Sequence, residues 1–275
     1  MHNVKKYYSI FYVICFFALL LLLYFVFTYH FVKEGFDVND FMNSIDVIYW
    51  INLDRATDRK KYMDDLLGNS IFKVIPNIRI SAVDGKIPDE MYKKIIKYNK
   101  QPEITDSEYG CLLSHLNTIS TFAKSNYTNA IIFEDDISLD FKPYWKKDLG
   151  EVISGAPPDW DIIMLSYGVG NNGFVQNEYE KYNGHFGAIS YLINKKGAKK
   201  LMDKTEYNGK YILNDNRHVS DFYIYSEVNT YVYKFPYFIS RKDNDSFIHP
   251  DHIETFHKVV EKNAIESYDK ENGNV

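Results

Sequence analysis

The segment from Tyr7 to Val32 contains no Asp, Glu, Lys or Arg and is apolar over most of its length. A bilayer core needs about 20 such residues, so the segment predicts one transmembrane helix. A cleavable signal peptide is the alternative, but its apolar region would be shorter and would end in small residues. This stretch ends Phe-Thr-Tyr-His-Phe-Val. We therefore expect a permanent anchor over 7–32.

The charges on the two sides of this segment predict its orientation. Lys5 and Lys6 precede it, whereas acidic residues soon follow Lys33. Positively charged residues stay preferentially on the cytoplasmic side. We expect a single-pass membrane protein with a cytoplasmic tail over 1–6, a stem over 33–45, and a lumenal or external domain.

The rest of the chain is long enough for one α/β domain, which we expect over 46–266, followed by a polar tail over 267–275. Residues 33–275 carry a net charge of about −7, and no arginine-rich helix occurs. This balance argues against a nucleic-acid partner. Cys15 and Cys111 are the only cysteines, and no disulfide between them is expected.

Strand and helix patterns alternate through this domain. Runs of β-branched and aromatic residues predict strands over 46–53, 77–83, 130–133, 161–165, 185–193 and 231–238. Helical spacing with start and stop signals predicts helices over 57–67, 89–98, 105–125, 195–204 and 220–228. Thr105 and Glu108 have the spacing of a capping box. The alternation predicts a mainly parallel central sheet covered by helices.

The strongest chemical signal is the run Glu134-Asp135-Asp136 directly after an apolar strand. Three adjacent carboxylates repel one another, and burying them is costly unless a cation compensates. Glu134 and Asp136 point the same way if the chain stays extended. A hard divalent metal that bridges a diphosphate would suit such a pair. The spacing alone favours a solvated acidic loop after an edge strand, and the preceding apolar strand makes the two interpretations equally consistent.

Other polar groups admit both a functional and a structural interpretation. Arg55 and Arg59 share one helical face and could meet phosphate, or they could form a solvated basic face. Asp221 near a helix start is typical of a cap, but in a cleft it could serve as a general base. Ser114 and His115 are helix neighbours that point apart, which argues against a hydrolase pair, and Cys111 is interpreted as a core residue.

Several short blocks occur in an order that resembles one enzyme family. They are Ile51-Asn-Leu-Asp-Arg55 with Asp58-Arg59, Ala82-Val-Asp-Gly85, Glu108-x-Gly-Cys-x-x-Ser-His115, Ile132-Phe-Glu-Asp-Asp136, Trp160-Asp-Ile-Ile163, Gly187-Ala-x-x-Tyr191, Lys196-Gly-Ala198 and Asp221. In this order the blocks resemble glycosyltransferase family 25, which includes bacterial lipooligosaccharide galactosyltransferases and procollagen hydroxylysine galactosyltransferases.

The resemblance implies a glycosyltransferase-A-type nucleotide-binding fold and inverting transfer of a hexose, galactose favoured, from a UDP-sugar. The acceptor would be a hydroxyl of a glycan, lipooligosaccharide or protein. Manganese or another divalent cation would be held by Glu134, Asp135 and Asp136, and Asp221 would be the base. The nucleotide site that the resemblance implies comprises Asn52, Asp54, Arg55, Arg59, Asp84, Glu108, Ser114 and His115.

Two other function classes are alternatives to the transferase hypothesis. A degenerate transferase fold could act as a membrane-bound binding or scaffold protein, but such a protein need not retain three clustered acids. A metal-dependent hydrolase could use the same acids, but it would usually need further ligands such as paired histidines. His249 and His252 are interpreted as surface residues rather than as such a pair.

Overall fold

The computed structural model describes residues 44–168, 175–241 and 257–271. The predicted anchor over 7–32, all but the end of the predicted stem, and both His249 and His252 lie outside these ranges. Within them, no helix is both long and apolar enough to cross a bilayer.

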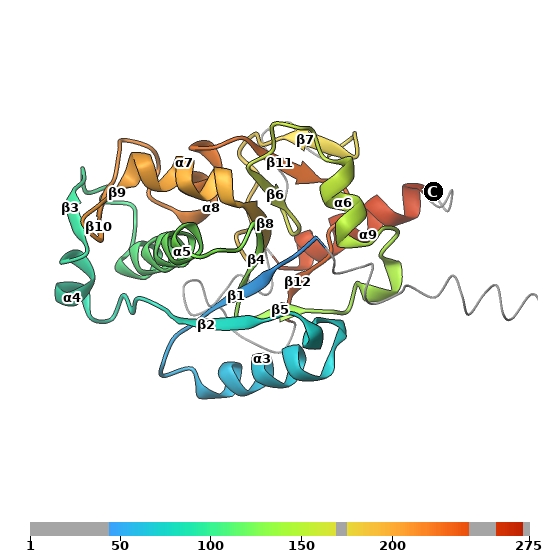
Figure 1. The fold of residues 1–275 in the computed structure, drawn as a ribbon, viewed down its shortest axis with the longest axis horizontal. Coiled ribbons are helices and arrows are strands. Elements are labelled where there is room, and N and C mark those ends of the chain that lie inside the picture. Colours follow the sequence, from blue (N-terminus) through green and yellow to red (C-terminus); the bar gives the residue numbers. More distant parts are fainter. Residues whose placement is uncertain (1–43, 169–174, 242–256, 272–275) are drawn as a thin grey trace, which may run out of the picture. The chain divides into compact units, whose positions relative to one another are not determined.

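A seven-stranded sheet forms the centre of the domain (Figure 1). Its strands are β1 (Val47–Asn52), β2 (Asn77–Ser81), β4 (Asn129–Glu134), β6 (Ile162–Met164), β7 (Tyr179–Lys181), β8 (Ser190–Asn194) and β11 (Thr230–Tyr233). The order across the sheet is β2-β1-β4-β8-β6-β11-β7. Only β8 and the edge strand β7 run against the other strands. The predicted mainly parallel sheet is therefore confirmed.

Helices pack on this sheet, and α3 and α5 lie on different sides of β1 and β2 (Figure 1). The described helices are α3 (Thr57–Asn69), α4 (Pro88–Tyr92), α5 (Asp106–Lys124), α6 (Leu149–Gly155), α7 (Lys195–Thr205), α8 (Ser220–Ser226) and α9 (Lys258–Glu271), with short 3-10 turns η1 (Ile71–Val74) and η2 (Lys142–Tyr144). The capping box predicted at Thr105 and Glu108 is present at the start of α5.

Side-chain alternation along the strands explains the two packed layers. Val47, Tyr49 and Ile51 of β1 share a core with the apolar face of α5, and the Tyr49 ring lies 6.2 Å from Phe122. On the other face of the sheet, the Phe133 ring of β4 lies 5.7 Å from Phe72 of η1. Successive strand residues point to opposite faces, so fully buried strands carry apolar side chains on both.

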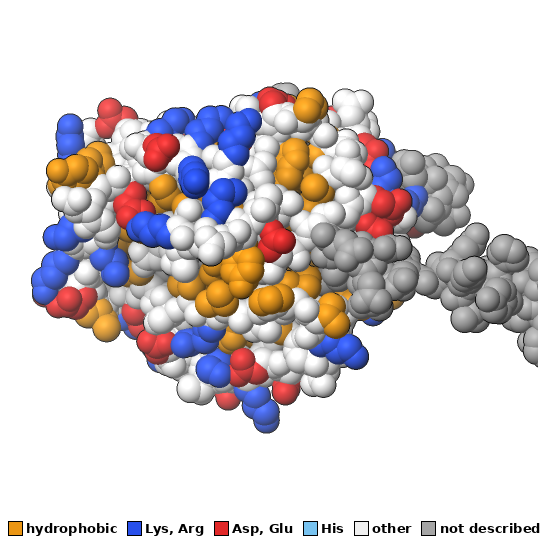
Figure 2. Space-filling model, in the orientation of Figure 1, with side chains coloured by type: hydrophobic (Ala, Val, Ile, Leu, Met, Phe, Trp, Pro, Cys, Tyr) orange, Lys and Arg blue, Asp and Glu red, His pale blue; other side chains and the backbone are white. Residues whose placement is uncertain are grey.

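Lysine side chains gather over α7 on the face shown in Figure 2. Several of these lysines donate hydrogen bonds to other parts of the domain. Lys195 donates to the carbonyl oxygens of Phe122 and Ser125, and Lys200 donates to Asp161. This basic surface therefore also ties α7 to α5 and to the sheet.

Two smaller sheets complete the described part of the chain, and one of them corrects a predicted helix. The three-stranded sheet pairs β3 (Ile95–Lys97) with β10 (Lys210–Ile212), which in turn pairs with β9 (Glu206–Tyr207); the two-stranded sheet pairs β5 (Ile137–Ser138) with β12 (Ile239–Ser240). The helix predicted over 89–98 ends at Tyr92. The reason is tertiary, because the amide of Tyr211 donates to the carbonyl of Lys94 and draws residues 95–97 into a strand.

Three other boundaries differ from the predictions. The strand predicted over 185–193 begins only at Ser190, since Gly187 adopts a φ of 120° that a strand does not allow. The strand predicted over 231–238 ends at Tyr233, shortly before Pro236, which lacks an amide donor. Helix α9 runs into the predicted polar tail, and there Tyr268 is buried and donates to the carbonyl of Pro236.

Candidate active site

A cleft lies where three neighbouring parallel strands end. Ile51 of β1 pairs with Ile80 of β2 and with Glu134 of β4, so the chain leaves all three strands at the same edge of the sheet. The cleft encloses about 650 Å³ of empty space that is partly open to solvent. Its walls are Ile51, Asn52, Leu53, Arg55, Arg59, Ala82, Val83, Asp84, Gly85, Ser107, Cys111, Ser114, His115, Glu134, Asp135 and Asp136. Ligands of open α/β sheets bind at such an edge.

Asp135 and Asp136 are buried in the turn that follows β4. Asp135 accepts hydrogen bonds from Asn52 Nδ2 at 2.6 Å and from Arg59 Nη1 at 2.8 Å. Asp136 Oδ2 has a long contact of 3.4 Å with the same Arg59 nitrogen. Asp136 Oδ1 is buried without a hydrogen-bond partner among the described residues. The acidic turn therefore has one acceptor to spare, and it faces a cleft.

Among the described residues, carboxylates outnumber cations at this turn. Arg59 is the guanidinium that contacts the two buried acids, and Glu134 adds a third carboxylate beside them. Burial, followed by repulsion from Glu134, raises the pKa of Asp136 to about 7. Burial also raises the pKa of Asp135, against the attraction of Arg59. A group that is shifted in this way inside a cleft is a candidate for binding a cation or for function.

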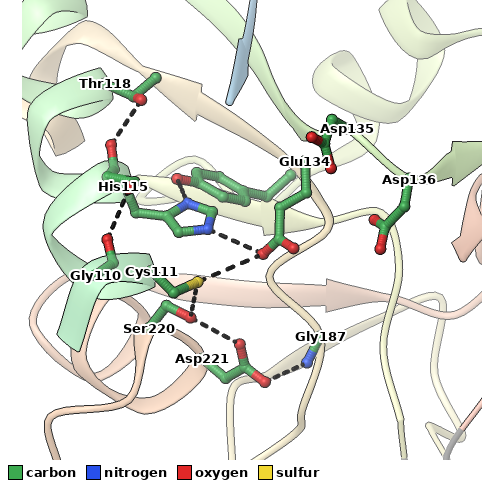
Figure 3. Close-up of polar contacts among 12 residues, drawn as sticks. Gly110, Cys111, His115, Thr118, Glu134, Asp135, Asp136, Gly187, Ser220 and Asp221 are labelled. Atoms are coloured by element: carbon green, nitrogen blue, oxygen red, sulfur yellow. Dashed lines mark hydrogen bonds and ion pairs between the residues drawn. The ribbon is translucent and has the colours of Figure 1, made fainter. Parts of the chain in front are cut away.

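The carboxylates of Glu134 and Asp136 both point toward the lower part of the view in Figure 3, and repulsion from Glu134 helps to raise the pKa of Asp136. We predicted that the two would point the same way if the chain stayed extended; β4 ends at Glu134, and the next two residues form a turn. Glu134 Oε1 lies 3.1 Å from His115 Nε2 and 3.9 Å from Cys111 Sγ. His115 Nδ1 lies 3.0 Å from the hydroxyl of Tyr191.

Helix α5 presses its first turns against the loop that follows β2. A Cβ atom on Gly85 would stand 2.4 Å from the carbonyl oxygen of Asp106, and one on Gly110 would stand 2.7 Å from that of Val83. Ser114 fastens the same contact, because its hydroxyl accepts the amide of Val83 at 2.8 Å. The two glycines thus explain how backbone and helix come close enough to form one wall of the cleft.

The predicted nucleotide-site residues divide into two groups. Asn52, Arg55, Arg59, Asp84, Ser114 and His115 line the cleft. Arg55 and Asp84 form an ion pair at 2.7 Å, and the hydrogen bond from Arg55 lowers the pKa of Asp84. The other two residues lie outside the lining.

Asp54 and Glu108 bind elsewhere in the fold. Asp54 accepts from Arg79 at 2.6 Å and from Ser81 at 2.8 Å. Glu108 accepts the amide of Thr105 at 2.7 Å as the second half of the capping box. The structure gives these two carboxylates local roles in holding the loop after β1 and the start of α5.

Asp221, the predicted base, lies near the cleft but does not line it. In Figure 3 its carboxylate lies below Glu134, next to Ser220 and Gly187. The amide of Gly187 donates to Oδ2 at 3.0 Å and Ser220 Oγ donates to Oδ1 at 3.2 Å. Burial raises the pKa of Asp221, partly offset by the amide of Gly187.

Cys111 is the cleft residue that sequence reasoning missed. We interpreted it as core, yet it is half-buried and lines the cleft. Its Sγ lies 3.4 Å from Ser220 Oγ as well as near Glu134. The signal was the four-residue spacing from His115, which puts both side chains on one helical face.

The same region of the chain carries the likeness to known proteins. Residues 45–152 match the family model described as glycosyltransferase family 25 (LPS biosynthesis protein). A protein of Anopheles gambiae named glycosyltransferase 25 family member is 29% identical over 180 residues, which is 58% of this chain and 29% of that protein. A protein of the same name from Drosophila melanogaster is 29% identical over 133 residues, or 44% of this chain and 21% of that protein. The chain spans less than a third of the length of these curated relatives.

Proposed function

Since this chain belongs to glycosyltransferase family 25, we propose that it transfers a hexose, galactose favoured, from a UDP-sugar to a hydroxyl of a glycan, lipooligosaccharide or protein. The observation that carries the proposal is the cleft at the ends of β1, β2 and β4, where polar groups converge around an unbalanced cluster of acids. A diphosphate with its metal ion is a ligand that such a cluster suits.

The acidic turn fits the divalent cation that the proposal requires. Asp136 Oδ1 is a buried acceptor without a partner among the described residues, and hard cations such as manganese take oxygen ligands. Asp136 would be the first ligand, and Glu134 and Asp135, which precede it, line the same cleft. When bound, the ion would neutralise the charge that develops on the departing UDP.

The remaining charges of the cleft suit the donor. Arg55 and Arg59 both line it and present guanidinium groups that match phosphate oxygens. Each is already paired with a carboxylate, Arg55 with Asp84 and Arg59 with Asp135. Donor phosphate would therefore compete with these carboxylates for the two arginines. The diphosphate would then lie between the loop after β1 and the acidic turn.

Inversion requires one displacement at the anomeric carbon. The acceptor oxygen would form the new bond to that carbon while the bond to the β-phosphate oxygen breaks and its electron pair leaves with UDP. The acceptor proton would pass to a carboxylate, for which Asp221 is our candidate. Burial raises the pKa of Asp221, which makes its carboxylate a stronger base for the acceptor proton.

Anchoring of the domain belongs to the same proposal. The uncharged segment over 7–32, with Lys5 and Lys6 before it, supports an N-terminal membrane helix and a lumenal or external catalytic domain. An acceptor built on a membrane lipid or passing through a secretory compartment would then be within reach.

The test is a donor screen on the full chain in detergent. UDP release from each UDP-sugar is followed with manganese and with chelator, and products are separated to distinguish transfer from hydrolysis. We expect manganese-dependent release from one donor, lower by about 100-fold or more in Asp136→Ala, because a metal ion supplies several kcal/mol of charge stabilisation. Asp203→Ala is the matched control, since Asp203 is an exposed aspartate of α7.

Two outcomes would contradict the proposal. If neither UDP nor any UDP-sugar binds with or without manganese, the scaffold hypothesis replaces it. If the sugar is released only to water while candidate acceptors are present, a hydrolase replaces it.

A further inference from the structure

Three different metal-binding side chains meet on one wall of the cleft. One ligand atom each from Cys111, His115 and Glu134 lie within 4.8 Å of one another. The thiol and the imidazole come from α5, and the carboxylate comes from the end of β4 (Figure 3). The proposed transfer chemistry uses neither the thiol nor the imidazole.

The distances suit a four-coordinate ion after a small movement. Metal–ligand bonds of about 2.0–2.3 Å in a tetrahedral site place ligand atoms roughly 3.3–3.8 Å apart. Glu134 Oε1 is 3.1 Å from His115 Nε2 and 3.9 Å from Cys111 Sγ. Since the three ligand atoms lie within 4.8 Å of one another, the Cys111 sulfur would have to move toward His115 by no more than roughly 1–1.5 Å to complete the triangle.

The surroundings of the three groups resemble those of known metal centres. Cys111 and His115 are four residues apart on a helix, so they present ligand atoms to one point. His115 Nδ1 contacts the Tyr191 hydroxyl at 3.0 Å, and such a contact fixes the ring and leaves Nε2 for an ion. The side chain of Glu134 is 24% exposed, which leaves a fourth position for water from the cleft.

We propose that Cys111, His115 and Glu134 form a binding site for a zinc-type transition-metal ion, separate from the Asp136 carboxylate that would hold the ion of the donor. Thiolate and imidazole favour zinc and cobalt, whereas manganese and magnesium favour oxygen ligands. Binding takes the proton from the Cys111 thiol and releases it to solvent, so affinity rises with pH. The ion would join α5 to the end of β4 and hold Glu134 against α5. The site does not depend on the chain being a transferase.

Cobalt is the probe, because a thiolate–cobalt bond gives a charge-transfer absorption that oxygen and nitrogen ligands do not give. The full chain with Cys15→Ser is used, so that Cys111 is its only thiol. We expect one cobalt per chain with this absorption, and displacement of cobalt by an equal amount of zinc. Cys111→Ser should abolish the absorption, and His115→Gln should weaken cobalt binding by tenfold or more.

Asp136→Asn separates this site from the proposed donor site and should keep the cobalt absorption. The proposal is overturned if cobalt saturates the chain without the absorption, if Cys111→Ser keeps it, or if Asp136→Asn removes it while its circular dichroism is that of the parent. Manganese-dependent UDP binding is measured on the same parent chain. Its presence without the cobalt absorption would reject this site and leave the transferase proposal standing.

Discussion

Asp136 and Asp161 are both buried aspartates next to strands of the central sheet, but they lie at opposite ends of those strands. Asp136 follows β4, whereas Asp161 precedes β6, which runs in the same direction. Asp161 Oδ2 accepts from Lys200 Nζ at 2.7 Å and from the amide of Asn229 at 2.9 Å. Asp136 shares one distant arginine contact with Asp135 and stands near a third carboxylate.

The difference shows that burial alone does not mark a functional acid. Each aspartate has an Oδ1 without a partner among the described residues. One lysine balances the charge of Asp161. The contacts of Asp161 with Lys200 and Asn229, which we call the Asp161 contacts, join α7, β6 and the segment before β11. Among the described residues, Arg59 is the cation that forms ion pairs with the two aspartates after β4, and one arginine does not balance three carboxylates. Within that part of the chain, the site would be completed by a further cation or by a proton.

The largest expected effect is a pH dependence to which Asp136 contributes most, with smaller contributions of the same sign from Asp135 and Asp221. The folded pKa of Asp136 of about 7 lies above its unfolded value of about 4, so in the metal-free chain the folded state holds a proton that the unfolded state releases. The free energy of unfolding should therefore fall as pH rises through this interval, by as much as about 1.4 kcal/mol per pH unit. Urea unfolding in chelator between about pH 5 and about pH 8 measures it.

Asp136→Asn should remove most of that slope, and Asp161→Asn should keep it. Equal slopes in the parent and in Asp136→Asn would break the comparison, because the charge imbalance would then not reside at the acidic turn.

The next effect is stabilisation by manganese. An ion that binds only the folded chain adds about 2.7 kcal/mol at a concentration of 100 times its dissociation constant. We expect manganese to raise the melting temperature of the parent and of Lys200→Met but not of Asp136→Asn. A similar rise in all three chains would mean that the ion binds elsewhere.

The third effect tests the Asp161 contacts. Asp161→Ala removes the acceptor of the Asn229 amide and of Lys200, and an unsatisfied buried donor costs about 1–3 kcal/mol. The free energy of unfolding should fall by that amount, as measured in urea. Asp203→Ala on the exposed side of α7 should change it by less than about 0.5 kcal/mol. Equal losses of unfolding free energy in the two variants would mean that the Asp161 contacts do not stabilise the fold.

The smallest effect tests the role of Glu108. Glu108→Ala removes half of a capping box and should cost about 0.5–1 kcal/mol of unfolding free energy. Calorimetry should find the affinity for UDP and manganese within about twofold of the parent. A large loss of that affinity would return Glu108 to the nucleotide site that the family resemblance implied.

Patterns local in sequence were sufficient to predict much of this fold. The apolar run before Glu134 predicted β4, and Thr105 with Glu108 predicted the start of α5. The family resemblance implied a nucleotide site that includes Asn52 and Asp84 and a metal site that includes Asp135. In the structure these three residues line one cleft.

What the sequence did not reveal depends on contacts between distant segments. Residues 95–97 look helical by spacing, yet β10 draws them into a sheet from more than a hundred residues away. The contacts of Glu134 with His115 and Cys111 join β4 to α5, and a turn of two acids carries no periodic signal that would predict them. Cys111 was assigned to the core because a helix pattern shows which residues share a face but not what the face meets.

The position of β8 has a consequence for how the chain is made. In the described sheet, β8 is the strand that joins β2-β1-β4 to β6-β11-β7, and it is synthesised some sixty residues after β4. Until then the apolar edge of β4 has no partner on that side, and such edges invite pairing with other chains. While residues between β4 and β8 are being synthesised, the free edge of β4 is therefore open to pairing with other chains. The acidic end of β4 is also made well before β8, its partner in the sheet.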